Sequence, residues 1–331
     1  MPFNRQRGIA LPLVLWVVAV MLVISLSFSL LIQSRVRRTE LLLNRFQAYL
    51  EAYSALQYGI QIILTGTKNA TELRGPNFAP VDDNNRYYLD GTPVAIPLFD
   101  KRPEISIQDY SGLINLRSYQ PLLINGLMNH FGASEETRRV FTDSLMDWID
   151  PDSLVRLNGA EKETYEPLGY WPSNNPLLNI DEILLIRGMD EALFSKMEPF
   201  LVLGYSMGIN PNTAPFDVLM AFPRMTENGA KGIMEFRKTG SIQNVTALSM
   251  IAGTNFAFYE SLFDFSPGGS LIVEASSPFG ENSRYVIRCH LRKRFGPSVA
   301  YETYEISRTV LPEEFGRWAP YDLTLWKEQV R

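Results

Sequence analysis

The segment IALPLVLWVVAVMLVISLSFSLLI, from Ile9 to Ile32, is an uncharged run of 24 residues in which the only polar side chains are three serines. As a helix it would be about 36 Å long, enough to cross the ~30 Å hydrocarbon core of a bilayer. A cleaved secretory signal has an apolar region of only about 7–15 residues and ends at a small-residue cleavage site. The segment therefore predicts a single membrane-spanning helix.

The helical pattern continues beyond the apolar run. Apolar residues recur at spacings of three and four from Leu42 to Leu64, which is typical of one face of an α-helix. Gly66 is the first residue expected to stop it. We therefore expect one helix with a membrane part at 9–32 and a part outside the membrane at 33–65.

Composition limits what the rest of the chain does. With 331 residues, 46% of them hydrophobic, it can bury a sizeable core in two or three structural units. The formal net charge of −5 argues against generic nucleic-acid binding. Cys289 is the only cysteine, which excludes an internal disulfide and a thiolate zinc site, and alternation in 284–292 places it on the apolar face of a strand. His130 and His290 lie far apart, so a histidine-based site is not expected.

Short strands are predicted at both ends of the region outside the membrane. Asp90-Gly91 predicts a hairpin between the first two of them. Between the two groups of strands, the chain from about Leu116 to Phe263 has helical spacing. The predicted strands are Arg86–Leu89, Val94–Ile96, Glu104–Asp109, Leu271–Ser276, Arg284–Arg292 and Ala300–Val310.

The helical middle contains an internal repeat. Residues 179–190 align with residues 244–255, and each copy is an amphipathic turn that ends at a glycine. Two small helical subdomains are the simplest interpretation. A phosphate-binding helix-hairpin-helix needs a second glycine, which Asp190 and Asn255 replace, so DNA binding is not expected.

Acidic residues are concentrated between Asp147 and Tyr165. Crowded oxygen ligands are what a hard cation such as calcium requires. Asp150, Asp152 and Glu161 have the spacing of positions one, three and twelve of an EF-hand, but the required glycine is replaced by Val155, which rules out a true EF-hand.

Alternatives to a calcium loop remain for this segment. The carboxylates can instead cap helices and bind loop amides, with Trp148 in the core. Paired carboxylates could also serve acid/base chemistry, but no nucleophile, phosphate loop or oxyanion signature accompanies them. We therefore expect a protein that is not an enzyme.

The junction before the apolar run resembles a type IV prepilin leader. A short basic leader, residues 1–8, ends in Arg7-Gly8 and leads directly into Ile9. The resemblance implies cleavage after Gly8 by prepilin peptidase and N-methylation of Ile9. It also places the N-terminus in the cytoplasm and the body in the periplasm. Pilins carry Glu at the fifth mature position, where this chain has Leu13, so its subunit need not pair there with a neighbour's terminal amine.

Over nearly its whole length, the chain resembles the general secretion pathway protein K family, the minor pseudopilin K of the type II secretion system. The resemblance implies an α+β fold in which a pilin-like N-terminal helix packs on a small antiparallel sheet, at 66–115 and 266–331. It implies a large all-α insertion of two SAM-like subdomains, at 116–204 and 205–265. Besides the leader, it rests on 111–116, 147–165, 179–188 and 208–215.

The resemblance also implies a function, partners and a location. Members of the family form the tip of the periplasmic pseudopilus with minor pseudopilins I and J and initiate its assembly for protein secretion across the outer membrane. Minor pseudopilin H, major pseudopilin G, prepilin peptidase and an inner-membrane assembly platform are the further partners implied. The chain would be a single-pass protein of the bacterial inner membrane until it is assembled.

The family's calcium loop is implied at Asp150, Asp152 and Glu161. Lys162 replaces the usual acid and adds positive charge, and Glu163 is the substitute ligand we expect. The alternative to the whole interpretation is a signal-anchored periplasmic protein with a metal-binding or hydrolytic activity of its own. The mature N-terminus distinguishes the two.

Overall fold

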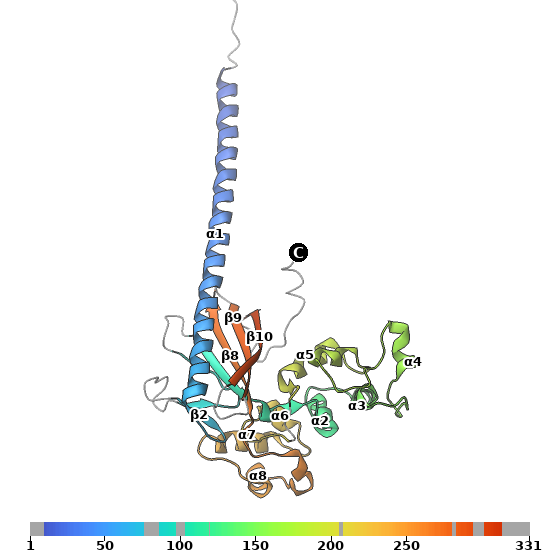
Figure 1. The fold of residues 1–331 in the computed structure, drawn as a ribbon. Coiled ribbons are helices and arrows are strands. Elements are labelled where there is room, and N and C mark those ends of the chain that lie inside the picture. The colour runs from blue at the N-terminus through green and yellow to red at the C-terminus, as the bar shows by residue number, and fades with distance from the viewer. Residues whose placement is uncertain are drawn as a thin grey trace, which may run out of the picture.

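The structure is a computed structural model that describes residues 10–75, 86–96, 103–118, 120–204, 208–279, 283–293 and 301–312. The fold is α+β. A long helix, α1, projects from a region of antiparallel sheet, and a helical region lies beyond the end of α1 and to one side of it (Figure 1).

Helix α1 runs from Ala10 to Thr65, and its 56 residues make it about 84 Å long. Its first half is exposed and is long and apolar enough to cross a membrane, as the sequence predicts. The residue after the helix, Gly66, donates its amide to Ile62 O at 2.7 Å. A Cβ on Gly66 would lie 2.6 Å from backbone oxygens of Ile62 and Arg74, so only glycine allows the chain to turn there.

The second half of α1 packs on the main sheet. Small residues, Ala52 and Ala55, are fully buried there and allow the helix to approach the strands closely. The sheet is antiparallel with strand order β10-β9-β8-β5-β4. Its strands are β4 (Val94–Ala95), β5 (Glu104–Asp109), β8 (Ser270–Phe279), β9 (Ser283–Lys293) and β10 (Tyr301–Pro312).

The predicted hairpin at Asp90-Gly91 is wrong. The strand before it, β3 (Arg86–Tyr88), pairs with β2 (Glu72–Arg74), which pairs with β1 (Thr67–Lys68) in a separate three-stranded sheet. Buried Glu72 joins the pair because its carboxylate accepts from Arg74 at 2.8 Å and from Arg86 at 2.6 Å. The turn instead carries the chain from the small sheet to the main one.

Cys289 occupies the position that the alternation predicts. It is completely buried on β9 in the core shared with α1. Burial raises the pKa of its thiol, which favours the uncharged form of a packed side chain. The next residue, His290, belongs to the opposite face of the strand, and its Nδ1 lies 2.5 Å from Tyr110 Oη.

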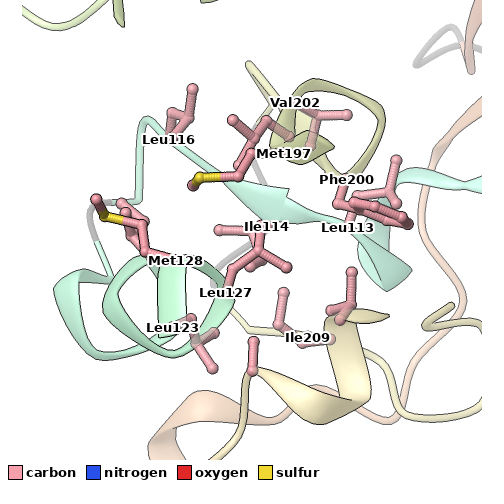
Figure 2. Packing of buried hydrophobic residues seen from close by; sticks show 14 of the residues in the cluster. Leu113, Ile114, Leu116, Leu123, Leu127, Met128, Met197, Phe200, Val202 and Ile209 are labelled. Atoms are coloured by element: carbon pink, nitrogen blue, oxygen red, sulfur yellow. The ribbon is translucent and has the colours of Figure 1, made fainter. Parts of the chain in front are cut away.

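The helical region forms a second core. In Figure 2, Leu127 of α2 lies beside Ile114, and Leu116, Met197 and Val202 lie on the other side of Ile114 in the same cluster. Strands β6 (Ile114–Asn115) and β7 (Leu201–Val202) pair in parallel across 85 residues of intervening chain and close one part of the region. The helices are α2 (Pro121–His130), α3 (Glu135–Ile149), α4 (Lys162–Tyr165), α5 (Glu191–Met197), α6 (Phe216–Met220), α7 (Glu227–Phe236) and α8 (Val245–Ala252), with 3-10 turns η1 (Tyr110–Gly112), η2 (Glu166–Leu168), η3 (Ile180–Leu185), η4 (Glu198–Phe200) and η5 (Ala257–Leu262).

The internal repeat has a common capping pattern. Asn179 caps η3 and Asn244 caps α8 through side-chain oxygens that accept from backbone amides. Each copy reaches a glycine with positive φ, Gly188 at 93° and Gly253 at 65°. The helix type differs, because the first copy is a 3-10 turn of six residues and the second an α-helix of eight.

A buried ion pair joins the helical region to the sheets. Arg237, at the end of α7, donates to Pro211 O at 3.1 Å, to Ala214 O at 2.7 Å and to Asp90 Oδ2 at 3.1 Å. Burial lowers the pKa of Arg237, and the charge of Asp90 opposes that change. Asp90 thus holds the helical region through a partner 147 residues away in sequence.

Candidate metal centre

The acidic segment begins where α3 ends. Asp150 follows the last residue of α3 and has extended φ and ψ of −79° and 157°. The next residue, Pro151, disfavours a helical conformation for Asp150, so the helix stops there. The chain then forms an irregular loop and returns at Glu161, the residue before α4.

Three of the predicted ligands come together in this loop. One carboxylate oxygen from each of Asp150, Asp152 and Glu161 lies within 4.8 Å of the others. Asp150 Oδ1 and Glu161 Oε1 are both buried without a hydrogen-bond partner. Buried polar atoms are normally paired, and converging unpaired carboxylate oxygens are what a hard divalent cation coordinates. The donor set therefore fits calcium.

Electrostatics at Glu161 support the same conclusion. Burial raises the pKa of Glu161, and the charges of Asp147, Asp150 and Asp152 raise it further. Four carboxylates thus repel one another in a partly desolvated place. A bound cation would reverse that repulsion and favour the ionised form.

One guanidinium offsets part of the negative charge. Arg156 Nη1 donates to Asp147 Oδ1 at 2.6 Å and to Asp150 Oδ2 at 2.5 Å. The hydrogen bond with Asp147 is the main cause of a raised pKa for Arg156. Four carboxylates and one guanidinium leave a formal charge of −3, enough to attract a divalent cation.

Comparisons with known proteins locate this site within a family. A family model described as "Type II secretion system (T2SS), protein K" matches residues 109–204, which contain the whole acidic loop. "Type II secretion system protein K" of Klebsiella pneumoniae is 26% identical over 227 residues, covering 63% of this chain and 67% of the relative. The Pectobacterium carotovorum subsp. carotovorum protein of the same name is 27% identical over 252 residues, covering 71% and 76%.

The chain is similar to type II secretion system protein K over about two thirds of its length. A solved structure agrees with the fold: a chain of the GspK-GspI-GspJ complex from enterotoxigenic Escherichia coli has a TM-score of 0.57, with 15% identity over 83% of this chain and 99% of that chain. The family consists of secretion pseudopilins, which are structural components.

The fourth predicted ligand of the acidic loop lies elsewhere. Glu163 is exposed on α4 and does not belong to the group of three carboxylates found among the described residues. Lys162 pairs at the surface with Glu166, at 4.0 Å between Nζ and Oε1. The positive charge that Lys162 adds is therefore shared with a neighbouring acid on the same helix face.

The acidic loop is held by contacts that the sequence does not reveal. A Cβ on Gly159 would lie 1.9 Å from Asp147 Oδ2, so glycine is required where the loop passes the buried carboxylate. Arg187 Nη1 donates to Gly159 O at 3.1 Å. The Arg156 pairs could have been suspected from a lone arginine among carboxylates, but no spacing rule identifies the Arg187 contact.

Aromatic side chains pack together next to the two ends of the loop. Trp148 is buried, as predicted, and its ring meets that of Tyr165 edge-on at a centroid distance of 5.2 Å. Tyr165 Oη accepts from Arg187 N at 3.1 Å. The other chemistry-bearing residues lie apart, since His130 pairs with Asp217 and His290 with Tyr110.

The prepilin junction lies outside the described residues. Gly8 and Ile9 are both among the residues before Ala10, so cleavage and methylation stay predictions. Leu13 lies on the described part of α1 and is 60% exposed there. In a membrane or a filament, an apolar side chain at this position has lipid or neighbouring helices to contact.

Proposed function

We propose that this chain is a K-family pseudopilin that forms the tip of the periplasmic pseudopilus and initiates its assembly. The observation that carries the proposal is the position of the helical region: α7 and α8 lie beyond the C-terminal end of α1, and α3, α4 and α5 extend to one side (Figure 1). In a filament whose subunits align their N-terminal helices, a subunit added on the side away from the membrane would need the space beyond the sheet. A helical region in that space would leave room for a further subunit only on the membrane side.

Minor pseudopilins I and J are the proposed partners in the tip. The solved chain of similar fold occurs in a complex with GspI and GspJ, which supports the same association here. Helix α1 offers a surface for it, because Leu42 and Phe46 remain 68% and 58% exposed beyond the uncharged segment. Minor pseudopilin H, major pseudopilin G and the assembly platform would be met later, during filament growth.

The anchoring that we propose follows from α1. Its apolar half would cross the inner membrane once, with the N-terminus in the cytoplasm and the body in the periplasm. Prepilin peptidase would cut after Gly8, and Ile9 would be the methylated terminus. The segment would then be withdrawn from the bilayer into the filament, where neighbouring helices replace lipid.

Calcium is the cation that we propose for the acidic loop. Asp150, Asp152 and Glu161 would hold it, and its charge would offset the burial and the carboxylate repulsion that together raise the pKa of Glu161. Its role would be structural, since it would join the end of α3 to the start of α4 across the loop. Glu163 would need a different side-chain position to contribute.

Immunogold labelling of sheared pseudopili tests the tip position. Antibodies against the helical region are expected to mark one end of each filament, and labels distributed along the filament would refute the proposal.

Co-purification from membranes tests the partners: the full chain is expected to recover I and J together, and deletion of 116–263 to abolish recovery. Mass spectrometry tests the cleavage site. The mature chain is expected to begin at methylated Ile9, whereas an intact Met1 or a cut after residue 32 would favour a signal-anchored protein.

A further inference from the structure

The loop above the acidic cluster exposes apolar side chains. Leu154 is 77% exposed, Val155 62% and Leu157 97%. We call residues 154–157 the apolar loop. Single exposed apolar residues are ordinary, but three within four residues at the edge of a folded region form a local apolar surface.

Carboxylates fix the backbone of the apolar loop with its amides turned inward. The amide of Leu154 donates to Asp152 Oδ1 at 2.8 Å, and the amide of Arg156 donates to Asp147 Oδ2 at 3.1 Å. Just beyond the loop, the amide of Asn158 donates to Asp143 Oδ2 at 3.1 Å.

These three hydrogen bonds, at alternate residues from Leu154 to Asn158, constrain the backbone of the loop. A loop already ordered in its exposed form loses little conformational entropy when a partner covers it.

More apolar surface lies in the segment that supports the loop. Leu168, Trp171 and Leu178 are 65%, 64% and 79% exposed. This segment is joined to the base of the loop, since Asn174 Nδ2 donates to Asp152 O at 3.2 Å. Tryptophan is one of the residue types enriched at the buried centre of protein interfaces, and the two leucines extend the apolar surface around it.

The apolar loop is remote from the surface proposed for filament assembly. Figure 1 shows α3 and α4 at the end of the helical region farthest from α1. Neighbouring subunits that pack along α1 would therefore leave the loop uncovered. Its exposure needs an explanation other than assembly through α1.

We propose that the apolar loop is a docking element for a protein partner that offers an apolar pocket rimmed by lysine or arginine. The charges beside the loop argue for this occupant. Asp152, which is exposed, accepts from the backbone of the loop, and half-buried Asp143 accepts from Asn158 just beyond it. Asp147 is buried and paired with Arg156, the one cation within the loop itself. Basic groups around a pocket would complement these carboxylates, whereas the phosphates of a membrane surface would be repelled.

Photo-crosslinking in secreting cells tests the contact. Benzoylphenylalanine is placed at Leu157 in the full chain and, as the matched control, at Met250, which is 73% exposed on α8. The Leu157 probe is expected to give one protein adduct that the Met250 probe does not give. Sequencing of the crosslinked peptide is expected to place it beside clustered Lys or Arg in the partner.

Substitutions link that adduct to function. Leu154→Asp is expected to lower the adduct and secretion by about 30-fold, the effect of losing an interface hot spot worth ~2 kcal/mol. Met250→Asp is expected to leave both unchanged. Recovery of I and J from membranes should be the same for both variants, which separates the docking element from the proposed tip assembly.

Several outcomes would overturn the proposal. These are the absence of an adduct at Leu157, an adduct with lipid, the same adducts at both probe positions, and a partner peptide without basic neighbours. Unchanged secretion in Leu154→Asp would also overturn it. If that variant loses I and J as well, Leu157→Ser, which adds no charge, decides between misfolding and lost docking, and wild-type secretion in Leu157→Ser refutes the proposal.

Discussion

Replacement of Arg156 by Gln should make this subdomain depend on calcium. The substitution removes the guanidinium that donates to Asp147 Oδ1 and to Asp150 Oδ2, while the Asp147 carboxylate stays fully buried. Removing one member of a buried pair costs about 3–5 kcal/mol. Because the Arg156 side chain is itself 35% exposed, solvent already screens part of its charge, and we expect a loss of about 2–3 kcal/mol without calcium.

Calcium should restore most of that loss. Without the guanidinium, the formal charge of the cluster changes from −3 to −4, and a divalent cation is no longer repelled by a neighbouring positive group. We expect calcium affinity to rise about tenfold or more. The stabilisation gained on adding calcium should therefore be larger in Arg156→Gln than in the wild type.

Denaturant unfolding of the full chain in detergent, followed by tryptophan fluorescence with and without calcium, measures this difference. Trp148 is buried beside Asp147 and reports on the subdomain. Arg139→Gln is the matched control, because Arg139 pairs on the same helix with exposed Glu135 and should contribute less than about 1 kcal/mol. An equal calcium effect in Arg156→Gln and the wild type would refute the reasoning.

Three further predictions concern the site, the helical core and the filament. Because the pKa of Glu161 is raised in the fold, its ionisation destabilises the calcium-free protein as pH rises above the ordinary value of 4.5. Glu161→Gln should therefore raise the calcium-free unfolding midpoint at pH 7 but not near pH 4.5. The same substitution should abolish the heat of calcium binding in calorimetry. Gly126→Ala should destabilise the fold by about 1–3 kcal/mol in denaturant unfolding, since its Cβ would lie 1.9 Å from Ala221 O, whereas Gly269→Ala, with open space, should be neutral. Leu13→Glu should not increase secretion in a plate assay, and a clear increase would contradict a tip subunit without a partner for that acid.

Features set by neighbouring residues were predictable from the sequence. An uncharged segment, a helical period and Gly66 predicted α1 to its last residue, because helix formation and membrane insertion depend on local composition and spacing. Strand alternation placed Cys289 in the core for the same reason. The three carboxylates of the candidate site also lie within twelve residues, so the sequence marked them as candidate ligands, but it was the resemblance to the family that singled them out as a calcium loop.

The tertiary structure decided which distant groups meet. Turn chemistry at Asp90-Gly91 suggested a hairpin, but the pairing of β3 with β2 and the contact of Asp90 with Arg237 depend on chain segments far along the sequence. Likewise, no local rule foretold that Asp147 would be buried against Arg156. Acidic residues in a row predict negative charge, whereas burial decides which of them lack partners, and unpaired buried oxygens are what make the loop a candidate for calcium.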